Sequence, residues 1–113
     1  MEESILTSIK KLLGIAEEYT HFDAHIIMHI NSVLMVLNQL GVGPEEGFYI
    51  EDASAYWEDF LSDPTQLQAT KTYIYQKVCL IFDPPTSSAV IEAMKESIRE
   101  FEWRLNHAAE FSY

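Results

Sequence analysis

The chain of 113 residues is long enough for one folded domain and too short for two. Its 48% apolar and 22% charged residues are the ordinary balance of a globular protein. A single cysteine excludes a disulfide framework and a zinc cluster built on cysteines. The net charge of −11 argues against a general nucleic-acid binder and against docking on anionic lipid, because both need a basic surface.

Two helices are predicted in the N-terminal part of the chain. Apolar residues recur with helical spacing over residues 4–13, which predicts a helix with one apolar face, a cap at Ser4 or Glu3, and an end at Gly14. A second helix is expected over residues 21–40. It starts at a variant of the capping box, with Thr20 three positions before Asp23, and a Gly-Val-Gly-Pro sequence ends it.

The second helix is apolar around most of its circumference. In so short a chain, this pattern favours burial against a partner subunit as well as against the domain's own core. Residues 24–44 carry no charge and are long enough to suggest a membrane span, but their His, Asn, Gln and Gly residues are too polar for hydrocarbon. We therefore expect no membrane segment, and the acidic N-terminus does not have the pattern of a signal peptide.

The middle of the chain is expected to be a connector. Residues 48–50 are compatible with a very short strand, and a short helix is predicted over residues 55–61 with Asp52 or Ser54 as its cap.

Two long helices are predicted in the C-terminal half. Ser62-Asp63-Pro64 is a strong start signal for a helix over residues 64–81, in which Lys71 lays its stem along an apolar surface. The last helix is expected from residues 86–88 to Asn106, because its apolar residues alternate spacings of three and four. Its outer face carries the charge pairs Glu100–Arg104 and Glu92–Lys95.

These elements predict a mostly α fold, a small bundle of four to five helices with one central loop. We expect residues 1–106 to form a single α-helical domain and residues 107–113 to form a C-terminal tail.

The charge is distributed unevenly along the chain. Residues 12–70 contain no Lys or Arg and carry ten acids: Glu17, Glu18, Asp23, Glu45, Glu46, Glu51, Asp52, Glu58, Asp59 and Asp63. One edge of the molecule is therefore predicted to be strongly negative.

Three histidines, His21, His25 and His29, line one face of the second predicted helix. Two histidines one turn apart can share a metal ion, but three spread over two turns cannot all ligate one ion. We favour a solvated or interface stripe over a metal site or a pH-responsive site, and we expect no metal and no cofactor.

The remaining chemistry-bearing residues favour structural roles. The carboxylate pairs lie in hydrophilic connectors, where a solvated acidic surface is a better interpretation than an acid–base pair or a cation site. Cys79 lies among apolar residues in a helix, which predicts a buried structural thiol rather than a nucleophile. The sequence makes no positive case for an enzyme.

Three stretches of the chain resemble the small head–tail connector proteins, also called adaptor or head-completion proteins, of phages with long non-contractile tails. They are IMHINSVLMVLNQLGVG (residues 27–43), GFYIEDASAYWEDFL (residues 47–61), and residues 71–106 with TYIYQKVCLIFDPPTSSAVIEAM and EFEWRLN. The resemblance covers roughly residues 4–106, and neither the first two histidines nor the tail belongs to it.

The resemblance implies a small α-helical bundle that assembles as a homo-oligomeric ring of about twelve copies beneath the portal protein. Such a ring lies at the head–tail junction of the virion and is assembled in the host cytoplasm. It extends the DNA channel, through which DNA passes without specific binding, and docks a stopper or tail-completion protein. An acidic edge suits that channel, because like charge keeps phosphates off its wall.

Residues are assigned to these contacts as expectations. The candidates for the subunit interface are Ile30, Leu34, Leu37, Trp57 and Trp103. The candidates for contact with portal or stopper are Phe48, Tyr49, Glu110, Phe111 and Tyr113. The alternative function is an acidic DNA mimic that inhibits a DNA-binding protein, although the acids cluster in connectors rather than in an even row. A metal-binding regulator built on the histidines is a third hypothesis.

Overall fold

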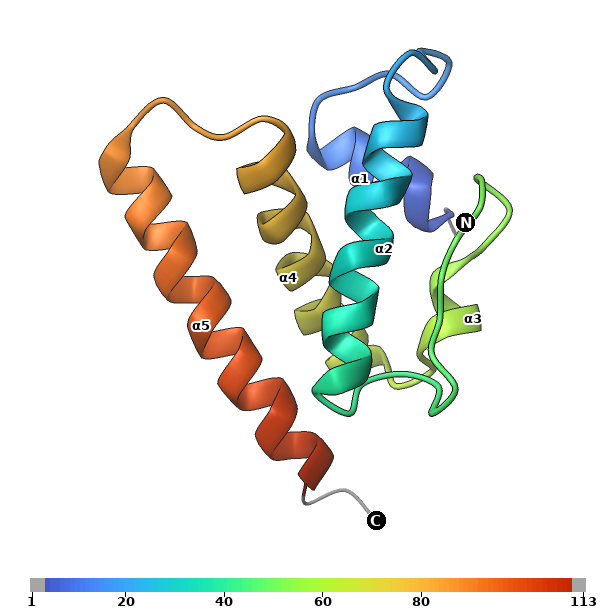
Figure 1. Cartoon of the computed structure of the whole chain (residues 1–113), viewed down its shortest axis with the longest axis vertical. Coiled ribbons are helices and arrows are strands. Elements are labelled where there is room, and N and C mark those ends of the chain that lie inside the picture. The colour runs from blue at the N-terminus through green and yellow to red at the C-terminus, as the bar shows by residue number, and fades with distance from the viewer. Residues whose placement is uncertain (1–3, 111–113) are drawn as a thin grey trace.

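The computed structural model describes residues 4–110, with side chains through residue 107, and Figure 1 shows their arrangement. This part of the chain contains five helices and no strands, which confirms the prediction of a small mostly α bundle. The helices are α1 (Ile5–Leu12), α2 (Asp23–Gln39), α3 (Trp57–Phe60), α4 (Pro64–Phe82) and α5 (Ser88–Glu110). The α4 helix lies between α2 and α5 and packs against both, while α1 packs against α2.

The first helix begins and ends where the sequence predicts. Ser4 Oγ accepts a hydrogen bond from the Thr7 backbone N–H at 3.1 Å, so Ser4 is the N-cap. Ile5, Leu6 and Ile9 are buried on its inner face.

The predicted capping box of the second helix is wrong. The α2 helix begins at Asp23, and its N-cap residue, Phe22, makes no side-chain cap bond. The backbone of Thr20 instead forms a turn, in which its carbonyl accepts from Asp23 N–H at 3.2 Å. The Asp23 carboxylate faces the ammonium group of Lys10 at 2.9 Å, so a long-range ion pair takes the place of the local cap.

The apolar circumference of α2 is only partly covered. Its inner face contributes Ile26, Ile30, Val33, Leu34 and Leu37 to the core. Met28 and Met35 are more than half exposed, at 57% and 60%. In residues 4–110, no helix has both the length and the hydropathy that a membrane crossing requires.

The connector between α2 and α3 is held by two asparagine side chains of α2, Asn31 and Asn38, the second of which donates to the Pro44 carbonyl at 3.1 Å. Asn31 Nδ2 donates to the carbonyl of Ile50 at 2.9 Å, and Asn31 Oδ1 accepts from the Ile50 N–H at 2.8 Å. Residues 48–50 form no strand, since the backbone of Ile50 bonds to this amide rather than to another strand.

The short helix α3 forms as predicted, but its capping side chain lies within the helix rather than before it. Asp59 Oδ2 accepts from the Tyr56 N–H at 2.9 Å, in place of the expected caps Asp52 and Ser54. Trp57 is buried, and its Nε1–H donates to Ser8 Oγ on α1 at 2.9 Å. This bond ties α3 to the first helix.

The central helix α4 starts at the predicted cap. Asp63 Oδ1 accepts from the Thr65 N–H at 3.0 Å, and Pro64 occupies the first turn. Lys71 is half-buried with its ammonium 5.3 Å from the centre of the Trp57 ring, which agrees with the predicted apolar surface under its stem. Ile81, near the C-terminal end of α4, is 53% exposed beside α5. Cys79 is buried, as expected.

The last helix, α5, packs its stripe of apolar residues against α4 and extends farther than predicted. Ile98 and Leu105 are buried, and both predicted charge pairs form, Glu100–Arg104 at 2.7 Å and Glu92–Lys95 at 3.8 Å. The helix continues past Asn106 to Glu110, and a parallel stack of Trp103 on His107, 5.0 Å between ring centres, supports the added turn. The Asn106 side chain also donates to the carbonyl of Leu40 at 3.2 Å.

A pair of glycine substitutions is expected to separate backbone strain from steric overlap. Gly14 and Gly43 both have positive φ, +83° and +89°. A Cβ at Gly14 would meet open space, whereas one at Gly43 would overlap the buried ring of Phe60. We expect Gly14→Ala to lower the free energy of unfolding by about 1 kcal/mol through strain alone, and Gly43→Ala by about 2 kcal/mol or more because the overlap adds to it. Urea unfolding measures both, and equal losses would contradict the overlap.

Candidate assembly surfaces

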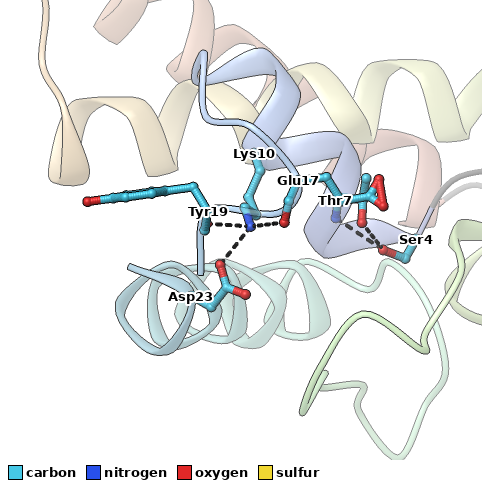
Figure 2. Close-up of polar contacts among 6 residues, drawn as sticks. All are labelled: Ser4, Thr7, Lys10, Glu17, Tyr19 and Asp23. Atoms are coloured by element: carbon cyan, nitrogen blue, oxygen red, sulfur yellow. Dashed lines mark hydrogen bonds and ion pairs between the residues drawn. The ribbon is translucent and has the colours of Figure 1, made fainter. Parts of the chain in front are cut away.

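The connector between α1 and α2 is fixed by a buried lysine. Figure 2 shows Lys10, which is 2% exposed, reaching three oxygen atoms. Its Nζ donates to the carbonyls of Glu17 at 2.9 Å and Tyr19 at 2.8 Å, and it forms an ion pair with Asp23 Oδ1 at 2.9 Å. The contact with Asp23 is an ion pair without hydrogen-bond geometry. Two of the three ammonium donors therefore bond to carbonyls, and the nearby carboxylate compensates the buried charge.

Sequence reasoning missed the role of Lys10, although a signal was present. Leu6, Lys10 and Leu13 follow the spacing of one helix face, so the lysine lies on the apolar side of α1. It is also one of the last two cations before the long acidic stretch. A cation on an apolar face beside acidic residues is a pattern that predicts a buried ion pair.

An open aromatic cleft of about 680 Å³ lies beside this pinned connector. Its lining residues are Leu13, Gly14, Ile15, Ala16, Tyr19, Phe22, Phe82 and Asp83. The rings of Phe22 and Phe82 meet edge to face at 5.3 Å, and Tyr19 is 51% exposed at the rim. Its lining consists mainly of apolar and aromatic residues together with Asp83, so it can receive an apolar side chain of a partner.

The predicted histidine stripe lies on the surface of α2 and of the turn before it. His21 and His25 are exposed, and His29 is half-buried with its ring 6.5 Å from that of Phe82. His21 packs edge-on against Phe22. Among the described side chains, no group of three His, Cys, Asp or Glu residues converges in a way that could hold a metal ion.

The acidic pairs of the connectors are exposed to solvent. All eight paired carboxylates of the connectors are exposed: Glu17, Glu18, Glu45, Glu46, Glu51, Asp52, Glu58 and Asp59. Two of them also order the local backbone. Asp59 caps α3, and Asp52 Oδ1 accepts from the Ser54 N–H at 2.8 Å. Hydrogen bonds with the side chain of Ser54 and then with its backbone lower the pKa of Asp52.

A second surface lies between α4 and α5, where a groove of about 290 Å³ is open to solvent. Lys77, Leu80, Ile81, Lys95, Ile98, Arg99 and Glu102 line it. At one end, the hydroxyl of buried Tyr73 donates to Glu102 Oε2 at 2.7 Å, and the Lys77 ammonium lies 3.6 Å from the same oxygen. Burial of Tyr73, and then its bond to Glu102, raises the pKa of the phenol well above its usual range.

Removing this phenol is expected to change the response to alkaline pH. Because the folded-state pKa of Tyr73 lies above the unfolded value, the stability from the neutral phenol is complete below about pH 10 and is lost as pH rises toward the folded-state pKa. At neutral pH, Tyr73→Phe should lower the free energy of unfolding by about 1 kcal/mol, because it removes the hydrogen bond to Glu102. Above pH 10 its unfolding free energy should fall less steeply than that of the unmodified chain, by up to about 1.4 kcal/mol per pH unit. Denaturant titrations between pH 7 and about 11 measure both effects. If the unfolding free energies of the two proteins fall equally steeply above pH 10, the raised pKa of Tyr73 is contradicted.

The predicted contact residues separate into buried and exposed groups. Ile30, Leu34, Leu37 and Trp57 are all at most 4% exposed and belong to the protomer's own core, so a neighbour cannot reach them in this fold. Trp103 is 66% exposed and Tyr49 67% exposed, while Phe48 packs on Phe60 with ring centres 5.2 Å apart. The side chain of Glu110, and Phe111 and Tyr113 as a whole, lie outside the described residues.

Comparison with known proteins gives one match. A model of a family described as phage connector protein matches residues 5–112. No curated protein and no solved structure matches the chain.

Proposed function

Because this chain belongs to the phage connector protein family, we propose that it is a structural head–tail connector that forms a ring, of about twelve copies, beneath the portal protein. The ring extends the DNA channel and offers a platform to a stopper or tail-completion protein. The observation that carries this proposal is the family match, which spans residues 5–112 and so nearly the whole fold.

The character of the molecule supports a structural role. Its ordered connectors are held by side chains from the helices, Lys10 in one case and Asn31 in the other. Fixed loops suit an assembly protein, because a surface that is already ordered loses less conformational entropy when a partner binds. We infer that the protein acts by packing and docking and carries out no catalysis.

The charge distribution supports a channel function. The segment 12–70 has ten acids and no Lys or Arg. In a ring, this charge is repeated in every copy, and a negative wall keeps the phosphates of passing DNA in the solvated centre. The same repulsion between copies favours monomers until the portal templates the ring.

Contacts with the portal and stopper belong to surfaces that the protomer leaves open. The aromatic cleft beside Tyr19 offers apolar area to a partner side chain. The tail residues Phe111 and Tyr113 remain predicted contacts on the basis of the sequence.

Quantitative mass spectrometry of purified phage particles tests this function. We expect the chain at a copy number equal to that of the portal subunit, or close to it. Absence from the particle would contradict the connector role. If the protein instead binds a basic DNA-binding enzyme and DNA competes for that binding, the alternative function as an acidic DNA mimic is supported.

A further inference from the structure

The groove between α4 and α5 combines an apolar floor with a cationic rim. Leu80, Ile81 and Ile98 supply the floor, and Ile81 is 53% exposed although it is a large aliphatic residue. Lys77, Lys95 and Arg99 supply the rim, where each also forms an ion pair with an acid of α5, namely Glu102, Glu92 and Glu96. The groove suits a ligand whose apolar centre covers the floor and whose negative flanks share the rim cations with these acids.

The rim cations belong to a minority on this molecule. Residues 71–107 contain five Lys or Arg, namely Lys71, Lys77, Lys95, Arg99 and Arg104, and five acids, Asp83, Glu92, Glu96, Glu100 and Glu102, for a net charge of zero. Residues 12–70 have a net charge of −10, from ten acids and no bases. The groove side is therefore the part of the surface where a strongly acidic segment meets the least repulsion.

The connector around Tyr49 has the complementary character. Tyr49 is 67% exposed, and the exposed acids Glu46 and Glu51 lie on either side of it. Its neighbours in sequence point inward: Phe48 packs on Phe60, and Ile50 is buried and bonded twice to Asn31. The tyrosine is therefore held outward on an ordered backbone, and aromatic anchors of this kind commonly dominate interfaces.

The two surfaces lie on opposite edges of the protomer. Figure 1 shows α5 along one edge and the connector of residues 43–56, in green, along the other, with α4 and α2 between them. The connector cannot reach the groove of its own chain, whereas the connector of a second copy can. Two different patches on opposite edges are the requirement for a head-to-tail contact that repeats around a ring.

We propose that the α4–α5 groove of one copy receives Tyr49 of a second copy, with the acids beside Tyr49 facing Lys95 and Arg99. The proposal rests on the proposed function, in which copies form a ring, and it names the surfaces that join them. It also reassigns Tyr49, a sequence candidate for portal or stopper contact, to the contact between copies.

Nuclear magnetic resonance of the isotope-labelled full chain tests the contact without requiring a stable ring. Spectra recorded from tens of micromolar to about 1 mM detect self-association even when it is weak. We expect amide signals of residues 46–51 to shift with concentration together with those of residues 77–81 and 95–99. Signals that do not move, or that move on other surfaces, would overturn the proposal.

Charge reversal supplies the specific control. Lys95→Glu/Arg99→Glu and Glu46→Lys/Glu51→Lys should each abolish these shifts alone, because like charges then face each other. An equimolar mixture of the two variants should restore them, since the reversed groove of one faces the reversed connector of the other. If both variants fold but their mixture does not recover the concentration-dependent shifts, the proposed contact between the connector and the groove is contradicted.

A single substitution measures how much Tyr49 contributes to self-association. Tyr49→Ala should weaken self-association about tenfold or more, as for other aromatic anchors. Tyr19→Ala, which removes another tyrosine that is more than half exposed, should leave self-association unchanged. Particle counting keeps the two proposals apart. If the particles contain one ring's worth of the chain but the spectra map the contact between copies to other surfaces, only this inference is contradicted. If the chain is absent from the particles, the connector function is contradicted whatever the spectra show.

Discussion

Leu34→Ala is expected to lower the free energy of unfolding of the isolated chain by about 3–4 kcal/mol. Leu34 is 1% exposed and lies on α2 among Ile30, Leu37 and residues of α4, so truncation removes buried area and leaves a cavity between two long helices. For a domain of this size the loss is a large part of the total stability. Urea unfolding followed by circular dichroism measures it at a concentration low enough to exclude association.

The matched control is the adjacent residue. Met35 is 60% exposed on the solvent side of α2, and Met35→Ala should change the unfolding free energy by no more than about 0.5 kcal/mol. If the two substitutions cost the same in the monomer, Leu34 would not be a core residue, and its predicted place at a subunit interface would regain support. The expected difference assigns Leu34 to the protomer's interior.

Lys10→Met is the second substitution with a large expected effect. It keeps the apolar stem of the side chain, one atom shorter, but removes the charge that the Glu17 and Tyr19 carbonyls and the Asp23 carboxylate surround. Removing one member of a buried ion pair leaves its partners uncompensated, and we expect a loss of about 3 kcal/mol. Because Asp23 is 25% exposed and keeps some contact with water, the loss should lie at the lower end of the range for such pairs.

Lys11→Met is the control for this substitution. Lys11 is exposed on the same helix turn, so its replacement should change stability by about 0.5 kcal/mol or less. Hydrogen exchange adds a local readout, because the connector of residues 13–22 should lose protection in Lys10→Met before the rest of the fold does. A variant as stable as the unmodified chain, with unchanged exchange in the connector, would show that Lys10 does not hold this segment.

Two polar anchors, one buried and one half-buried, explain how a small domain can present ordered loops. Lys10 on α1 and Asn31 on α2 each bond to the backbone of a connector that lacks secondary structure of its own. Backbone groups that find partners inside the fold do not depend on solvent or on a neighbouring subunit for their hydrogen bonds. The connectors therefore keep their shape in the free protomer, as the proposed contact through Tyr49 requires.

The sequence by itself determined the features that depend on neighbouring residues. Ser4 and Asp63 cap helices because their side-chain oxygens bond to amides two or three residues ahead. The Gly-rich end of α2 and the apolar stripe of α5 are likewise local patterns. The uneven charge is a property of composition alone, and the resemblance to connector proteins, which the family match confirms, also lay in the order of the residues.

Only the tertiary structure decided which apolar residues face inward and which loops are anchored. On a helix that is apolar nearly all round, periodicity cannot tell Leu34 from Met35, because the covered side depends on where α4 packs. The Thr20 cap failed for a related reason, since a long-range ion pair to Lys10 draws the Asp23 carboxylate away. Contacts such as Asn31 with Ile50 join residues far apart in the chain, and their free energy exists only once the helices have brought them together.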